Sequence, residues 1–330
     1  MLTHGSAQSG RSSGVEHNLA KVGVEGSNPF ARSNYHCLRG RVRSLPGLGS
    51  SVVPAPERNS PPPVLPAVST QLDKFDSSAF EPPPDAVDFY VESLKLLKES
   101  GIPFLLSGTY ALSCFTGITR PTKDLDVFCK PSDAPKILGF FKSRGYEIEM
   151  EDERWIGKVW LGEHFFDVIF NISSASIPIT DDWFNDVYEA EVYGTKVRVT
   201  PPTQFILSKL FLQTRYRYDG ADIVHTILIK HDEIDWQWLL SNMELYWEVL
   251  LINVLNFRFV YPTERDLIPR WLYDELLDRL RAQDEMPPAS IRICRGRLIS
   301  PTDYAVDVSE WGFADVVGKG VDEKHERPKH

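Results

Sequence analysis

The chain has 330 residues, 42% of them hydrophobic and 12% aromatic, which is enough for two domains with packed cores. Its formal net charge of −10 argues against a protein that simply coats nucleic acid, although it is compatible with a local basic groove. The four cysteines are scattered without a Cys-x-x-Cys pair, which gives no zinc signature and suits a reducing compartment. No apolar run reaches the ~20 residues of a membrane helix and no signal-peptide core is present, so we expect a soluble, cytoplasmic enzyme.

Residues 1–75 differ in composition from everything that follows. They are rich in Ser, Gly and Pro and have almost no helical or strand periodicity. Such a stretch cannot bury enough apolar surface to offset the entropy of ordering it. We therefore expect a disordered N-terminal extension that carries no function.

Part of this extension, residues 10–33, resembles a translated glycine tRNA gene. Permitted codons for residues 18–22 reproduce an anticodon arm with a glycine anticodon, and those for residues 26–29 reproduce a T-arm. A D-arm and complementary acceptor-stem sequences fall in order and in frame around them. We infer that translation starts downstream, near Val68 or Leu72. A natural disordered tail is the alternative.

Periodicity divides the rest of the chain into an α+β region over residues 76–200, a helical region over 201–300 and a charged tail over 301–330. The first region is predicted to contain a helix over 85–100, a strand over 103–106, a helix over 109–116, a strand over 124–129, a helix over 134–144, and hairpins over 155–170 and 189–199. The second is predicted to contain helices over 204–216, 221–228, 236–240, 247–259 and 271–281. We therefore expect an α+β fold, with a mixed sheet, flanking helices and a following α-helical domain.

Three aspartates on two of the predicted strands carry the clearest chemical signal. Asp124 and Asp126 are two residues apart, so their carboxylates project from the same face of a strand. Asp167 lies in an otherwise apolar strand. Converging carboxylates repel one another unless cations neutralise them, and magnesium is the hard cation that links carboxylates to nucleotide phosphates. The pattern predicts a two-ion magnesium site at Asp124, Asp126 and Asp167 for phosphoryl displacement.

The turn that precedes these strands suits the binding of a triphosphate. Gly108 follows a short apolar strand and opens a helix, so backbone amides and the helix N-terminus can approach phosphates. Ser107 and Thr109 flank this glycine, and Thr109 adds a hydroxyl. Arg120 and Lys123 come just before the carboxylates and are candidates to balance phosphate charge.

Each of these features also has a simpler explanation. An Asp-x-Asp pair alone is most often a solvated strand end, and a glycine between strand and helix is commonly only a turn. Lys209 fits a surface lysine, and His225 fits a packed or surface histidine. Asp219 and Asp222 fit helix caps. The order of the motifs, each on the expected element, favours the functional interpretation.

The segment 106–126, LSGTYALSCFTGITRPTKDLD, taken with Asp167, resembles the DNA polymerase beta superfamily of nucleotidyltransferases. It is most similar to a bacterial branch that holds abortive-infection type IV toxins and many uncharacterised nucleotidyltransferases. Similarity to that group extends over 103–315 and includes segments 215–225, 257–269 and 294–300. Ser107 stands where many members have a second glycine, and the gap to Asp124 is longer than in aminoglycoside-modifying members, which leaves the acceptor class open.

The resemblance implies a nucleotidyltransferase fold and transfer of a nucleoside monophosphate from a nucleoside triphosphate to an acceptor, with release of pyrophosphate. It implies that Asp124 and Asp126 bind both magnesium ions, and that Asp167 joins one of them and helps to activate the acceptor. Lys209 matches a lysine that contacts the triphosphate in the toxin branch. Asp222 aligns with a downstream acidic residue there.

Several functions remain open at this point. The acceptor is a tRNA, a protein or a small molecule, and a small adjacent antitoxin gene would favour a toxin. A catalytically inactive, nucleotide-binding regulator is the main competing function, and the intact set of three aspartates disfavours it. An RNA-binding helical module with a vestigial domain is a third possibility, which the acidic charge disfavours.

Overall fold

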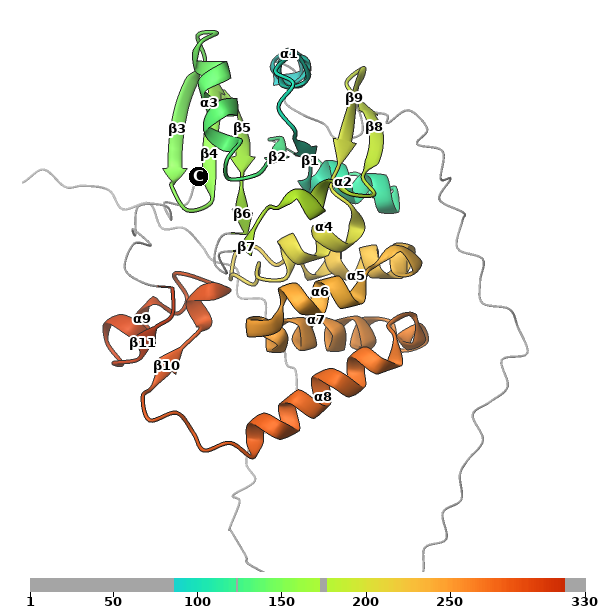
Figure 1. Ribbon diagram of the computed structural model, residues 1–330, viewed down its shortest axis with the longest axis vertical. Coiled ribbons are helices and arrows are strands. Elements are labelled where there is room, and N and C mark those ends of the chain that lie inside the picture. The colour runs from blue at the N-terminus through green and yellow to red at the C-terminus, as the bar shows by residue number, and fades with distance from the viewer. Residues whose placement is uncertain (1–85, 123, 173–176, 318–330) are drawn as a thin grey trace, which may run out of the picture. The chain divides into compact units, whose positions relative to one another are not determined.

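The computed structural model describes residues 86–122, 124–172 and 177–317 (Figure 1). The predicted N-terminal extension with its tRNA-like segment lies outside the described residues, and so does Lys123. All of the described residues belong to one compact unit of the chain. No helix in this described part is long and apolar enough to cross a membrane.

A mixed sheet forms the first part of the described chain. Its seven strands have the order β3-β4-β5-β2-β1-β9-β8 among the described residues. β2 is parallel to β5 and β1 is parallel to β9, whereas the other neighbours are antiparallel. The strands are β1 Leu105–Leu106, β2 Asp126–Phe128, β3 Glu147–Asp152, β4 Ile156–Leu161, β5 His164–Ile169, β8 Tyr188–Val192 and β9 Thr195–Val199.

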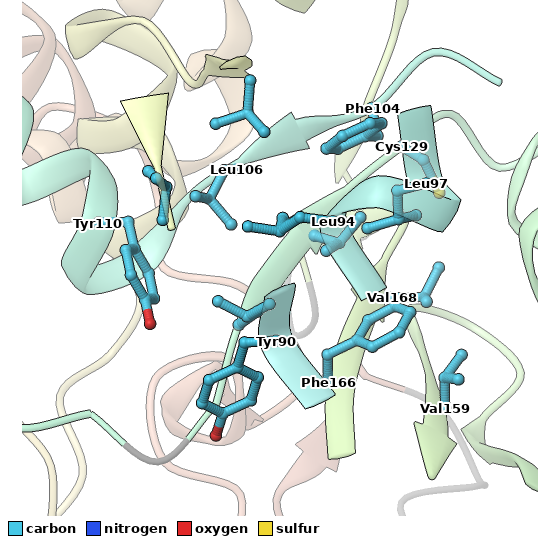
Figure 2. Close-up of a cluster of buried hydrophobic side chains, with 14 of the residues drawn as sticks. Tyr90, Leu94, Leu97, Phe104, Leu106, Tyr110, Cys129, Val159, Phe166 and Val168 are labelled. Atoms are coloured by element: carbon cyan, nitrogen blue, oxygen red, sulfur yellow. The ribbon is translucent and has the colours of Figure 1, made fainter. Parts of the chain in front are cut away.

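Three helices accompany this sheet: α1 Ala86–Glu99, α2 Gly108–Thr116 and α3 Ala134–Lys142. α1 is amphipathic and buries one stripe of apolar side chains, and α3 packs against β3, β4 and β5. Figure 2 shows Tyr90, Leu94 and Leu97 of α1 gathered with Phe166 and Val168 of β5. This cluster covers one face of the sheet.

Helices make up most of the second part. They are α4 Pro202–Lys209, α5 Gly220–Lys230, α6 Trp236–Asn242, α7 Trp247–Val260 and α8 Arg270–Asp284. α4 packs on α5 and α6, α5 packs on α7, and α7 packs on α8 (Figure 1). The expected fold class, an α+β protein with a mixed sheet, flanking helices and a following set of helices, is confirmed.

Short elements complete the described chain. β6 Asn171–Ile172 pairs with β7 Ile177–Pro178, and β10 Ile293–Cys294 pairs with β11 Ala314–Asp315. α9 Ala305–Ser309 and β11 lie in the stretch that the sequence predicts to be a tail. Single 3-10 turns are formed by Asp181–Phe184, His231–Glu233, Glu244–Tyr246, Arg265–Leu267 and Gly296–Leu298.

Side chains alternate between two hydrophobic clusters on the two faces of the sheet. Leu106 and Val127 belong to the cluster under α1 and α3, whereas Leu105 and Phe128 belong to the cluster formed with the helices of the second part. This alternation follows from the two-residue period of a strand. On β2 and β5, a polar residue that lies between two residues facing α1 therefore points to the opposite face, towards the helical part.

One predicted helix, over 204–216, is too long. α4 ends at Lys209, and the chain then forms a turn closed by a bridge between Gln213 and Tyr218. The hydroxyl of Thr214 accepts the backbone N–H of Arg217 at 2.9 Å and donates to the carbonyl of Arg217 at 3.1 Å. These local hydrogen bonds of Thr214 hold a turn where the helix was predicted to continue.

Candidate active site

Asp126 and Asp167 lie side by side on neighbouring parallel strands. Asp126 opens β2 and is in register with Asp167 of β5. The adjacent side chains Leu125 and Val168 are fully buried in the cluster under α1 and α3. Both carboxylates therefore project from the opposite face of the sheet, towards the helical part. The sequence predicted this convergence of Asp126 with Asp167, and the strand register brings it about.

The turn at Gly108 lies directly against the carboxylate of Asp126. Gly108 has a φ of +59°, and a Cβ added there would lie 1.8 Å from Oδ2 of Asp126. The backbone N–H of Ser107 donates to the carbonyl of Asp126 at 2.9 Å, which ties the turn to β2. A glycine is required here both by the positive φ and by the close approach. The N-terminus of α2 is thus held beside the carboxylate.

Two hydroxyl groups flank this turn. Ser107 is buried, and its Oγ has no hydrogen-bond partner among the described residues. Such a buried, unpaired hydroxyl is uncommon in a native protein and marks a position where a ligand atom or a water is expected. Thr109, the next residue after Gly108, is half-buried. The sequence predicted all three residues as a phosphate-binding turn, and that role stays a prediction.

Asp124 and Asp126 interact electrostatically. Burial raises the pKa of Asp126, and the negative charge of Asp124 raises it further, while Lys209 and Arg217 act in the opposite direction. The hydroxyl of Thr122 donates to Oδ1 of Asp124 at 3.3 Å. These two half-buried carboxylates thus repel each other, and a cation beside them would relieve the repulsion.

Asp167 is paired with a lysine that the sequence interpretation missed. Nζ of Lys158 lies 2.6 Å from Oδ1 of Asp167 and 2.8 Å from Glu151. Burial raises the pKa of Asp167 to about 6, which outweighs the lowering by Lys158, and the charges of Asp126 and Asp124 add to the rise. The two-residue turn between β4 and β5 places Lys158 directly opposite Asp167, so the signal was present in the sequence.

A network of ion pairs around two buried aspartates, Asp219 and Asp222, lies at the start of α5. Nζ of Lys209 donates to Oδ2 of Asp219 at 2.6 Å and lies 3.6 Å from Oδ2 of Asp222. Arg120 holds Asp222 with two hydrogen bonds, at 2.9 Å and 2.8 Å. Arg217 donates to both oxygens of Asp219, at 3.2 Å and 3.1 Å. Arg120 and Lys209, which the sequence assigns to nucleotide binding, are thus each paired with an aspartate.

The donor atoms at the three aspartates suit magnesium, because all of them are hard carboxylate oxygens. Asp124 and Asp126 sense each other's charge, but Asp167 is engaged by Lys158. Within the described residues, no group of three or more His, Cys, Asp or Glu side chains is gathered closely enough to hold a metal ion. The chemistry of these donors is compatible with magnesium, and the roles of Asp124, Asp126 and Asp167 as metal ligands stay predictions.

Comparison with known proteins gives no match to any protein-family model and no match among the curated proteins. Among solved structures, a lincosamide antibiotic adenylyltransferase bound to lincomycin is 19% identical, with a TM-score of 0.32 over 44% of this chain and 98% of that chain. A nucleotidyltransferase-like protein from Paracoccidioides brasiliensis is 16% identical, with a TM-score of 0.36 over 56% of this chain and 92% of that chain. A putative nucleotidyltransferase from H. pylori is 14% identical, with a TM-score of 0.31 over 62% of this chain and 99% of that chain. No TM-score among these reaches 0.5, so the function has to be argued from the residues of the chain.

Proposed function

We propose that this chain is a nucleotidyltransferase, which moves a nucleoside monophosphate from a nucleoside triphosphate to an acceptor and releases pyrophosphate. The observation that carries the proposal is the approach of the α2 N-terminus to the carboxylate of Asp126 at Gly108. A helix N-terminus attracts anions, so a phosphate would bind at the start of α2. It would then lie close to the negatively charged carboxylate of Asp126. A bound cation would reduce the repulsion between these two anions.

Magnesium is the cofactor that this arrangement suits. Asp124 and Asp126 would hold it, and Asp167 would join them for a second ion. When bound, magnesium would neutralise the carboxylates and the charge that develops on the phosphates during displacement. The raised pKa of Asp126 supports this assignment, because it reflects a carboxylate whose charge is poorly compensated by the protein alone.

The chain's own groups would bind and orient the nucleotide. The turn Ser107–Gly108–Thr109 offers backbone N–H groups, two hydroxyls and the positive end of the α2 dipole to the triphosphate. The unpartnered hydroxyl of Ser107 supports this role, because a phosphate oxygen would give it an acceptor. Asp167, with a pKa of about 6, would be largely ionised at neutral pH and able to accept the proton of an acceptor hydroxyl.

One observation favours a second candidate, a nucleotide-binding regulator without catalytic activity. Lys158 contacts Asp167 at 2.6 Å, and a carboxylate that stays engaged in this pair is not free for metal or acceptor. A regulator of this kind would bind the triphosphate without turning it over.

The decisive experiment incubates the purified protein with each labelled nucleoside triphosphate, magnesium and a cell extract. An enzyme releases pyrophosphate and labels one fraction of the extract, and Asp126→Asn abolishes both. The matched control is Asp133→Asn, a buried aspartate that is paired with Lys136 on α3. If the wild-type protein releases no pyrophosphate with any acceptor but binds a triphosphate, the regulator replaces the enzyme as the function.

A further inference from the structure

Lys209 and Arg217 share the same anion, Asp219, but they differ in accessibility. The side chain of Lys209 is 5% exposed and lies between Asp219 and Asp222. The side chain of Arg217 is 59% exposed. Its Nε and Nη2 donate to Asp219, which leaves the other terminal nitrogen, Nη1, outside this pair. Of these two cations, Arg217 is therefore the one that can meet a ligand from solvent without breaking a buried ion pair.

The backbone around Arg217 is firmly held. The backbone N–H of Thr214 donates to the carbonyl of Arg217 at 2.9 Å, and Thr214 Oγ accepts the N–H of Arg217. The ring of Tyr218 lies against Gly220, where an added Cβ would come within 2.2 Å of the ring. Residue 220 begins α5, so the tyrosine fixes the turn against the start of that helix. Arg217 is thus presented from a turn that is held by local hydrogen bonds and by the contact of Tyr218 with Gly220.

This turn faces the carboxylate site. α5 packs against both α2, which begins at Gly108, and α4, which ends at Lys209. Burial lowers the pKa of Arg217, but the combined effect of Asp219, Asp126 and Asp124 raises it more than burial lowers it. The charge of Arg217 in turn lowers the pKa of Asp126. The packing of α5 and these charge interactions thus place the guanidinium within electrostatic range of the two aspartates.

We propose that Arg217 is the side chain that contacts the phosphates of the bound nucleotide, and that Lys209 is a positioning residue that holds its anchor, Asp219. The identity of the ligand as a nucleotide rests on the proposed function. A guanidinium offers a planar fork of donors that matches phosphate oxygens, and two of its donors already fix its orientation. Lys209 cannot take that role while it balances two buried acids, because its departure would leave them unpaired.

The proposal differs from what the resemblance implies for Lys209, and it is tested by binding alone. Calorimetry measures the affinity of the full chain for inorganic tripolyphosphate in the presence of magnesium. Arg217→Gln is expected to weaken binding about tenfold, equivalent to about 1.4 kcal/mol. Arg217→Lys keeps the charge without the fork and should fall in between. Arg281→Gln is the control, because it removes an exposed arginine that pairs with a single aspartate on α8.

A double-mutant cycle separates positioning from direct contact. If Lys209 acts through Arg217, Lys209→Gln weakens binding in the wild-type background but adds no further loss in the Arg217→Gln background. A lysine that contacts phosphate directly would give additive losses. The melting temperature of each variant is measured first, so that the affinities refer to folded protein.

The two proposals fail in different ways. Failure of the wild-type protein to bind tripolyphosphate, unchanged binding by Arg217→Gln, or additive losses in the cycle would each overturn the assignment of Arg217 and Lys209. Binding that depends on Arg217 in a protein without nucleotidyl transfer would keep the assignment and overturn the proposed enzyme activity.

Discussion

At the scale of single residues, the candidate site is dominated by acidic groups that lie too close together. Asp126 and Asp167 are in register on adjacent strands, and the charge of Asp124 raises the pKa of both. The cations nearby, Lys158 among them, compensate this charge only in part, because both pKa values remain raised. Repulsion between these carboxylates lowers the stability of the metal-free protein, whereas the same carboxylates favour the binding of a cation.

Substitution of one carboxylate should reveal that cost. Asp126→Asn is expected to stabilise the metal-free protein by roughly 0.5–1 kcal/mol, because it removes like charge opposite Asp167. Nucleotidyl transfer should be lost. Thermal melts in a chelator, together with an assay of pyrophosphate release, check both effects. Asp133→Asn should instead lower the melting temperature, since Asp133 pairs with Lys136 at 2.6 Å. A variant that melts lower than wild type yet retains activity would contradict the assignment of Asp126.

Asp167 makes the stability of the metal-free protein depend on pH. Its pKa is about 6 in the folded protein against a usual value of 3.8, so the folded state binds the proton more tightly. The resulting stabilisation is complete below about pH 3.8 and is lost as the pH rises through about 6. Its upper limit is about 3 kcal/mol, at ~1.4 kcal/mol per pKa unit. Denaturant titrations in chelator, compared with Asp167→Asn, should show wild type losing stability relative to the variant between about pH 4 and pH 7. A constant difference across that range would show that Asp167 titrates normally.

The sequence predicted the acids of the site better than its bases. Strand periodicity and a predicted hairpin place Asp126 and Asp167 on one face of the sheet, as the structure shows, whereas Asp124 lies just before β2, outside the strand that was predicted to hold it. The role of the three aspartates as metal ligands stays a prediction. Lys158 follows from the same hairpin, since the turn of Gly162 and Glu163 pairs it with Asp167. The ion pairs of α5 were not predictable in this way, because they depend on how that helix packs against α2. Sequence periodicity carries no information on such packing.

At the scale of secondary-structure elements, α2 has a glycine of positive φ at each end, and the two differ in their surroundings. Gly108 has a φ of +59° and contacts Asp126, whereas Gly117 has a φ of +71° and nothing lies within 4 Å of an added Cβ. Gly117 ends the helix in a left-handed conformation, and its N–H donates to the carbonyl of Ser113. Backbone strain is therefore common to both positions, but crowding occurs only at Gly108.

Alanine at each end should separate these contributions. Gly117→Ala is expected to cost about 1–2 kcal/mol, which is the penalty of a left-handed non-glycine residue. Gly108→Ala should cost about 1–3 kcal/mol more, because the new methyl group displaces the Asp126 carboxylate. Chemical denaturation gives both values. Equal costs at the two positions would show that the turn moves away from Asp126 without resistance.

The turn that carries Arg217 is also attached to the C-terminal segment. The backbone N–H of Arg215 donates to Oδ2 of Asp303 at 3.1 Å, and its guanidinium lies 3.2 Å from Oδ1 of the same residue. Ser300 donates its hydroxyl to Asp303 at 2.7 Å. The segments 215–225 and 294–300 thus meet through one aspartate.

Loss of this attachment should make the turn easier to cleave. Asp303→Asn is expected to accelerate limited trypsin digestion after Arg215 and Arg217, because the turn is no longer anchored and opens locally more often. Mass spectrometry of the fragments locates the cleavage. Asp307→Asn on α9 is the control for a change of charge in the same segment. Cleavage rates that are equal in wild type and Asp303→Asn would show that the turn is held without Asp303.

At the scale of the whole molecule, the described chain is organised around a sheet with a hydrophobic cluster on each face. Leu106 and Val127 belong to one cluster, whereas Leu105 and Phe128 belong to the other, so the same two strands contribute to both clusters. The sequence predicted the α+β class, the hairpins and the later helices from local periodicity. It did not predict the strand order or β3, an acidic edge strand, because those depend on contacts between distant segments.

Residues 1–67 offer little apolar surface for such clusters. Their composition of Ser, Gly and Pro predicts that a chain starting at Val68 melts at the same temperature as the full chain and is equally soluble. Differential scanning calorimetry of the two proteins checks the expectation. A melting temperature several degrees lower in the shorter chain would show that the first residues pack against the rest.

The strand order also determines when the site can assemble during synthesis. β1 lies between β2 and β9, so the centre of the sheet stays incomplete until residue 199 has left the ribosome. The ion pair of Arg120 can form only after Asp222 has been translated, which is 102 residues further along the chain. Asp124, Asp126 and Asp167 are therefore translated well before the ion pairs around them can form. The entropic cost of closing such long loops delays those ion pairs further. A nascent chain that stalls before α5 emerges therefore presents Arg120 and Lys209 without their partner Asp222, and this ion-pair network is completed only when α5 has been made.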